Sequence, residues 1–156
     1  MNRPLVLLPM LLLAACNVQP KNPAHGDDDV SIRADESGNI AFNLPIAEGQ
    51  IKVPGQMMRN SDFDIDGVKL MPGSSVNGFN VNAHDKTARV EMTFTAPGSP
   101  DEVRSYFLEQ FKQKGDEVTL AGDAVTGQSK DGDRFTIRVG PAQSGSQGKI
   151  EIQSKD

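Results

Sequence analysis

ARVEMTFTAPGSPDEVRSYFLEQFKQKG, residues 88–115, contains the two elements that decide the fold. In its first part, Val90, Met92 and Phe94 alternate with polar residues. An alternation of period two is typical of a strand that buries one face. Pro97-Gly98 then breaks the pattern. The stretch therefore begins with a strand that has one apolar side.

The second part predicts a helix over residues 99–114. Ser99 suits the N-cap, Pro100 suits the first helical position, and Glu102 completes a capping box. Gly115 is a natural stop for the helix. Apolar residues recur at helical spacing at Val103, Phe107 and Phe111. We expect this apolar stripe to pack on one face of an antiparallel sheet.

Further strands are expected after the helix, around residues 118–120, 125–127, 135–139 and 150–152. A three-residue hairpin loop at Lys130-Asp131-Gly132 sets Val125 opposite Ile137 and Gly127 opposite Phe135. A nine-residue Gly/Ser-rich loop is expected before the last strand. The predicted fold class is α+β, an antiparallel sheet with one helix on a face, in the order β-α-β-β-β over residues 87–156. This order resembles small α+β envelope domains found in lipoproteins. The resemblance implies the fold and does not indicate a function.

Residues 30–86 are predicted to form short β-hairpins, with a boundary near residue 86. Strands are expected at 30–32, 40–44 and 51–53, and residues 82–86 are expected to turn. The segment Asp62-Phe63-Asp64-Ile65-Asp66-Gly67 matches the first half of a calcium loop, but Gly73 stands where a bidentate Glu belongs. Asp66-Gly67 is a strong two-residue hairpin turn. The hairpin is therefore the favoured interpretation, and the calcium site is the alternative.

The first fifteen residues have the three parts of a secretory signal. Met1-Asn2-Arg3 is a short basic start, residues 5–13 are apolar apart from one proline, and Ala14-Ala15 is small. The apolar run is about half of the ~20 residues that a membrane-spanning helix needs. We therefore predict that residues 1–15 are a cleaved signal peptide.

Leu13-Ala14-Ala15-Cys16 resembles the lipobox of bacterial lipoproteins. The resemblance implies that the Cys16 thiol receives a diacylglycerol, that cleavage falls between Ala15 and Cys16, and that the new amine is acylated. More than one acyl chain implies a durable attachment to the lipid bilayer. Asn17 stands where an Asp holds many such lipoproteins in the inner membrane, so the resemblance favours the periplasmic side of the outer membrane. The alternative is an ordinary cleaved signal.

Residues 16–29 are predicted to be the lipidated cysteine and a flexible tether, because only Val18 is apolar between Asn17 and Asp29. At ~3.1 Å per residue, an extended tether would reach about 40 Å from the bilayer. His25 precedes three consecutive Asp residues. A solvated linker explains this cluster better than a metal site does.

Composition and charge exclude several classes of partner. The chain has 156 residues and a net charge of −5, and without residues 1–15 it has 15 basic and 21 acidic side chains, net −6. Such a chain lacks the basic clusters that bind nucleic acid or an anionic lipid surface. Cys16 is the single cysteine. Its lipidation would leave no disulfide and no thiol nucleophile.

No catalytic or metal-binding motif is found. The chain lacks a nucleophile elbow, a phosphate-binding loop and zinc-ligand spacing. The two histidines are His25 and His84. We therefore expect no catalytic residue, no metal and no cofactor, and a lipid-anchored, non-enzymatic module that presents a sheet surface to an envelope protein or glycan. The alternatives are a small-ligand carrier, with a cleft between residues 30–86 and 87–156, and a hydrolase that uses His84.

Overall fold

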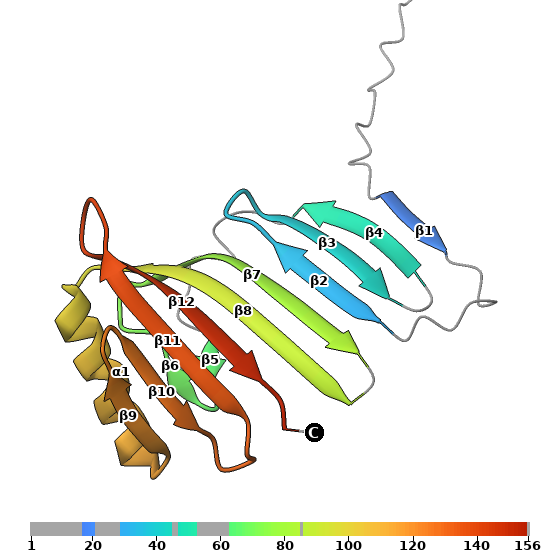
Figure 1. The fold of residues 1–156 in the computed structure, drawn as a ribbon. Coiled ribbons are helices and arrows are strands. Elements are labelled where there is room, and N and C mark those ends of the chain that lie inside the picture. Colours follow the sequence, from blue (N-terminus) through green and yellow to red (C-terminus); the bar gives the residue numbers. More distant parts are fainter. Residues whose placement is uncertain (1–16, 21–28, 45–46, 53–62, 85, 156) are drawn as a thin grey trace, which may run out of the picture.

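The fold is an antiparallel sheet with one helix (Figure 1). A computed structural model describes residues 17–20, 29–44, 47–52, 63–84 and 86–155. The described elements are β1 (Asn17–Pro20), β2 (Val30–Ala34), β3 (Asn39–Leu44), β4 (Ala47–Lys52), β5 (Asp64–Ile65), β6 (Val68–Lys69), β7 (Ser75–His84), β8 (Thr87–Ala96), α1 (Pro100–Lys114), β9 (Glu117–Ala121), β10 (Ala124–Gln128), β11 (Arg134–Pro141) and β12 (Ser146–Gln153). This confirms the coarse fold class.

Helix α1 begins and ends where the sequence predicts. The backbone N–H of Ser99 donates to Glu102 Oε2 at 2.7 Å, and the backbone N–H of Glu102 donates to Ser99 Oγ at 3.4 Å, so the capping box is complete. The Ser99 backbone N–H and the Ser99 hydroxyl, which donates to the same Oε2 atom at 2.8 Å, lower the pKa of the Glu102 carboxyl. Gly115 ends the helix in the left-handed conformation, at φ 84°. Local sequence alone therefore fixes both ends of α1.

The ten-stranded sheet has the order β1-β4-β3-β2-β7-β8-β12-β11-β10-β9. The chain leaves β8 through α1 and enters β9 at the far edge, then returns through β10 and β11. Strand β12 fills the place between β11 and β8, where Ile150 lies opposite both Ile137 and Met92. The C-terminal part thus has a strand at each of the four places expected after the helix, which is one more than the order β-α-β-β-β counts.

The core lies between α1 and this part of the sheet. Val103, Phe107 and Phe111 are fully buried, and the Phe111 ring stacks on Phe135 with centroids 4.3 Å apart. Phe135 lies opposite Gly127, where an added Cβ would come within 2.5 Å of the ring. The predicted register, with the aromatic ring over the bare glycine, is confirmed.

The Asp66-Gly67 hairpin is also confirmed. Asp64 lies opposite Lys69, and Ile65 opposite Val68, across a turn with φ 50° at Asp66 and φ 76° at Gly67. Two positive φ values are typical of a type I′ turn. The apolar side of the hairpin, with Ile65, Val68 and the following Leu70, joins the core.

Three expectations about loops and ends are wrong. Strand β11 ends at Pro141 and β12 begins at Ser146, so the loop between them is residues 142–145 and not the nine residues expected. Residues 82–84 belong to β7 rather than to a turn. Asn17–Pro20, assigned to the tether, forms β1 and pairs with the edge of β4, because an edge strand offers unpaired backbone groups. The rest of the tether, except Asp29, lies outside the described residues.

The sheet continues across residue 86. Strands β7 and β8 pair from Ser75 with Thr95 to His84 with Thr87. Ile65, Val68, Leu70 and Val76 belong to the same core cluster as Phe107. The boundary expected near residue 86 therefore falls between two paired strands, and it does not separate two cores.

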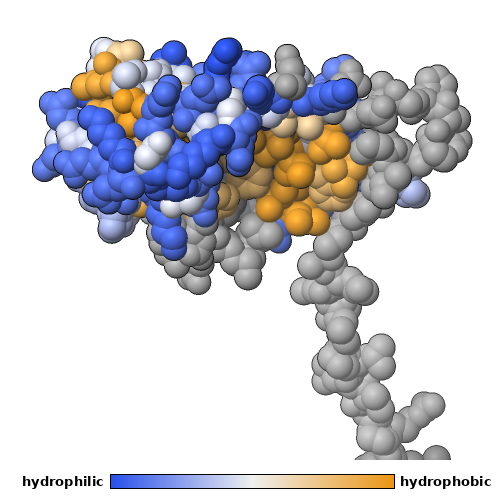
Figure 2. All heavy atoms as spheres, turned by 90° about the horizontal axis from the view of Figure 1, so that it is seen from below, coloured by the Kyte–Doolittle hydropathy of each residue, from blue (hydrophilic) through white to orange (hydrophobic). Residues whose placement is uncertain are grey.

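One face of the sheet is mainly apolar and the other is mainly polar. Residues paired across β3, β2, β7 and β8 alternate between an apolar face, continuous with the core, and a polar face. Helix α1 contacts β6 and β9–β12, so within the described residues it covers only the C-terminal end of the apolar face. Figure 2 shows hydrophobic side chains that remain visible over the N-terminal half.

The core packing predicts that Phe107→Ala lowers the free energy of unfolding by about 3–5 kcal/mol, because a fully buried ring leaves a cavity. Chemical denaturation would measure the loss. Ser105→Ala, on the exposed side of the same helix, is the matched control and should change stability by less than about 0.5 kcal/mol. Equal effects of the two substitutions would contradict the packing.

Candidate functional site

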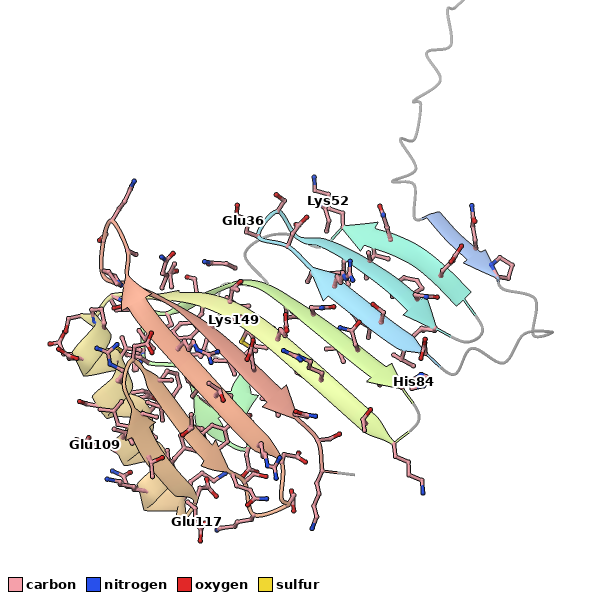
Figure 3. The ribbon with its side chains drawn as sticks, in the orientation of Figure 1. Glu36, Lys52, His84, Glu109, Glu117 and Lys149 are labelled. Carbon is pink, nitrogen blue, oxygen red and sulfur yellow. The ribbon has the colours of Figure 1, made fainter. Side chains whose placement is uncertain are left out.

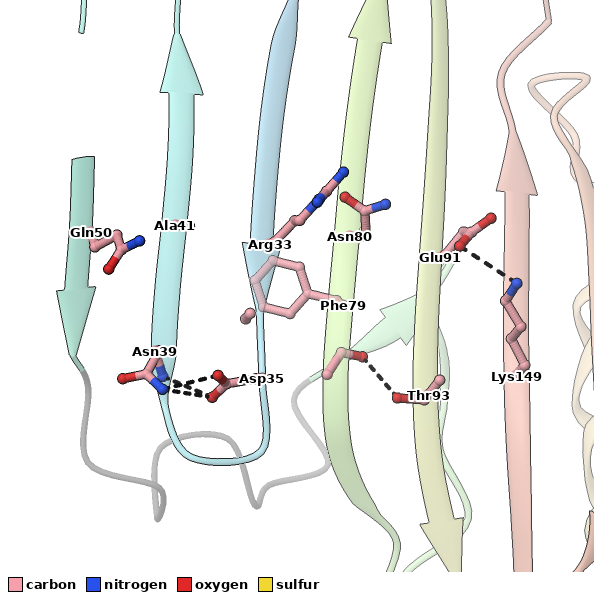
Figure 4. A pocket seen from close by; sticks show the side chains of 12 residues that line it. Arg33, Asp35, Asn39, Ala41, Gln50, Phe79, Asn80, Glu91, Thr93 and Lys149 are labelled. Carbon is pink, nitrogen blue, oxygen red and sulfur yellow. Dashed lines mark hydrogen bonds and ion pairs between the residues drawn. The ribbon is translucent and has the colours of Figure 1, made fainter. Parts of the chain in front are cut away.

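A hollow lies on the polar face of the sheet, where the N-terminal strands meet β8 and β12. Its volume is about 700 Å³. Figure 4 shows its lining from close by. The lining residues are Arg33, Ala34, Asp35, Asn39, Ala41, Gln50, Gly78, Phe79, Asn80, Glu91, Thr93 and Lys149. We call this hollow the polar groove.

Strand register brings the polar side chains together. Arg33 on β2 lies opposite Asn80 on β7, and Asn80 lies opposite Glu91 on β8. Ala41 on β3 extends the same row on the other side of Arg33, and Gln50 on β4 follows it. Because side chains at paired positions share a face, this row forms the floor of the polar groove. The small side chain of Ala41 leaves room in it.

Two groups in this row have no partner among the described residues. The Arg33 side chain is exposed, and its guanidinium makes no ion pair or hydrogen bond there. The Asn80 Oδ1 atom is buried and accepts no hydrogen bond. Leaving a buried acceptor unsatisfied costs roughly 1–3 kcal/mol. The groove therefore holds a free cationic donor beside an acceptor that a ligand could satisfy.

A charge network forms the β8–β12 side of the polar groove. Lys149 Nζ lies 2.7 Å from Glu151 Oε1 and 3.4 Å from Glu91 Oε2. The hydrogen bond with Glu151 raises the pKa of Lys149, and the same bond lowers the pKa of Glu151. Arg89 also pairs with Glu91, at 3.1 Å. These ion pairs place Glu91 beside Lys149, so this wall of the groove presents a carboxylate and an ammonium group.

The opposite end of the groove is shaped by the β2–β3 turn. The Asp35 carboxylate accepts hydrogen bonds from the backbone N–H groups of Ser37 and Asn39, at 2.9 and 3.1 Å. It also accepts from the Asn39 side-chain amide, at 2.9 Å. These bonds, that of the Asn39 side chain first, lower the pKa of Asp35. The Asp35 carboxylate therefore mainly stabilises the β2–β3 turn through hydrogen bonds to its backbone, as Asp residues do in such turns.

His84 lies apart from this groove, at the end of β7 (Figure 3). Its Nδ1 atom pairs with the Asp29 carboxylate, and a smaller hollow of about 480 Å³ is lined by both and by Ser31. The sequence did not predict this meeting of His84, Asp29 and Ser31. However, Ser31 lies opposite Asn82 rather than next to His84, and the His84 side chain is 69% exposed. An activated serine needs a hydrogen bond to its base in a shielded site.

The other predicted site residues cannot be placed. Ala15, Cys16 and His25 lie outside the described residues. In the part of the chain that is described, no group of three or more His, Cys, Asp or Glu could hold a metal ion. Nor is any helix in that part long and apolar enough to cross a bilayer.

Comparison with known proteins gives no family. No family model, no curated protein and no solved structure matches this chain. The functional argument therefore depends on the chemistry of the sites themselves.

Sequence reasoning missed the polar groove because it depends on long-range pairing. The alternation in residues 30–34 places Arg33 on a polar face, and the same signal applies to Asn80. The pairing of β2 with β7, which brings the two side chains together, joins segments about forty-five positions apart. No local pattern encodes that pairing.

The hairpin at Asp66-Gly67 predicts that calcium leaves the melting temperature unchanged. Asp64 Oδ1 already accepts a hydrogen bond from the backbone N–H of Gly67, at 2.8 Å, and is thus used by the turn. A site with a Kd 100-fold below the added calcium would stabilise the fold by ~2.7 kcal/mol. Thermal melts with millimolar calcium and with chelator would detect this. A rise of several degrees that Asp64→Ala abolishes would overturn the hairpin-only interpretation.

Proposed function

We propose that this chain is a lipid-anchored lipoprotein of the bacterial cell envelope, on the periplasmic side of the outer membrane, and that it acts as a non-enzymatic binding module. The resemblance of Leu13-Ala14-Ala15-Cys16 to a lipobox supports the anchor. The observation that carries the binding role is the pair of unpartnered groups, Arg33 and Asn80 Oδ1, on the floor of the polar groove. In this proposal residues 1–15 are removed and Cys16 carries the acyl chains.

A glycan that carries carboxylates fits the polar groove best. Sugar hydroxyls both donate and accept hydrogen bonds, which matches the amides of Asn39, Gln50 and Asn80 and the carboxylate of Glu91. The forked guanidinium of Arg33 suits a carboxylate on the same ligand. Soluble fragments of the cell wall combine both features, since they join amino sugars to acidic peptides.

The carrier alternative is less well supported. A carrier of small apolar ligands needs a mostly apolar cavity that encloses its ligand. The hollow between residues 30–86 and 87–156 is instead open, and charged and amide side chains line it.

The hydrolase alternative is supported by one observation, the hollow that His84, Asp29 and Ser31 share. Hydrolysis of a simple ester such as p-nitrophenyl acetate would test it. Activity above background that both Ser31→Ala and His84→Gln abolish would favour the hydrolase over the binding module.

The binding role predicts that cell-wall glycan fragments shift the NMR signals of β2, β7 and β8. Arg33→Gln should weaken their binding about tenfold or more, because a hydrogen bond to a charged group contributes about 1.5–3 kcal/mol. Lys52→Gln removes an exposed cation that does not line the groove and is the matched control. Equal losses with both variants would indicate non-specific charge attraction.

The anchor predicts that Cys16→Ala blocks acylation and normal processing. The unchanged protein should fractionate with membranes, and its N-terminal Cys16 should carry the added mass of acyl chains. The Cys16→Ala variant should lack that mass. Asn17→Asp is the control, because it should keep the acyl chains and shift the protein toward the inner membrane. Acyl mass that persists in Cys16→Ala would contradict the anchor. Mass spectrometry of the purified proteins would decide.

A further inference from the structure

Within the described ranges, no helix covers the apolar face of the sheet over its N-terminal half. Ile32 lies opposite Phe42 on one side and Val81 on the other, so these side chains share a face. We call the six half-buried residues Val30, Ile32, Ile40, Phe42, Leu44 and Val81 the open apolar face. Helix α1 contacts β6 and β9–β12 and does not reach it. Figure 2 shows the hydrophobic patch.

Strand β1, which begins one residue after the proposed lipid attachment point, lies at the same end of the molecule. Strand β1 is the outermost strand beside β4 and β3, and its first residue, Asn17, pairs with Gln50. Cys16 directly precedes Asn17 in the sequence, and neighbouring Cα atoms are only ~3.8 Å apart. The tether predicted over residues 16–29 does not lie between Cys16 and the sheet, because β1 begins at Asn17. Helix α1 covers the opposite end of the sheet.

We propose that the open apolar face lies against the bilayer to which Cys16 is attached, in contact with the lipid acyl region. The inference rests on the proposed acylation of Cys16. An anchor one residue from β1 keeps this face near the membrane at a high effective concentration. Burial of its side chains in lipid then adds a second attachment to the acyl chains.

The chemistry of the face favours lipid over an anionic surface or a basic protein. None of its six residues is charged, and the chain without residues 1–15 has a net charge of −6. Attraction to anionic lipids would require basic clusters. The contact is therefore apolar and insensitive to salt. This revises the expectation of a domain held at a distance by a tether alone.

Tryptophan fluorescence tests this orientation, because the chain contains no Trp. The probe is the acylated protein from Cys16 onward, in vesicles of phosphatidylcholine with brominated acyl chains. Phe42→Trp places an indole on the open apolar face. Ala41→Trp places one on the opposite face of the same strand, where the polar groove leaves room. Val81→Trp reports the same face as Phe42→Trp from β7, should Phe42→Trp fold poorly.

We expect the bromines to quench Phe42→Trp and Val81→Trp at least severalfold more than Ala41→Trp, at physiological and at molar salt. Equal quenching of Phe42→Trp and Ala41→Trp, or no quenching of either, would overturn the proposal. An indole that is shielded from aqueous acrylamide but not quenched by bromolipid would also overturn it, and would indicate a second copy of the chain on this face. A protein that lacks acyl chains and does not enter vesicles would refute the anchor instead, so the two failures are distinguishable.

Discussion

Packing of the α1 aromatic residues onto the C-terminal strands is the contact on which the rest of the structure depends. Phe107 and Phe111 are fully buried, and Phe111 stacks on Phe135 over the bare Gly127. This contact closes one end of a wide sheet, because a helix shields the apolar side chains of only a few strands. The β5–β6 hairpin extends the cover with Ile65 and Val68. Beyond it, the strands keep their apolar face with no described helix over it.

The two faces of the uncovered half have opposite chemistry because side chains alternate along each strand. Ile32 belongs to the open apolar face, and its neighbour Arg33 belongs to the polar groove. A shift of one residue in the pairing of β2 with β7 would exchange the two, so the register decides which side chains each face presents. If the apolar face lies on lipid, the polar groove faces away from the membrane and stays accessible to a soluble or wall-bound ligand.

Local signals predicted the parts of the fold that depend on neighbouring residues. The capping residues Ser99 and Glu102 set the start of α1, and the Asp66-Gly67 turn set its hairpin, since each depends on contacts within a few positions. Sequence reasoning failed where distant segments meet. Asn17–Pro20 looks like a linker by composition, yet its backbone pairs with β4, which composition does not report. The groove was missed for the same reason, because Arg33 and Asn80 meet only through long-range pairing.

The position of the last strand has a consequence for when the protein can fold. Strand β12 lies between β8 and β11, so Ile150 joins two parts of the sheet that no other described strand connects. The core under α1 is therefore incomplete until residues 146–153 have emerged. For a chain with an export signal, as proposed here, this core then forms only after residues 146–153 have crossed the membrane. Until β12 is available, β8 and β11 lack the strand that joins them, and the sheet is left in two parts.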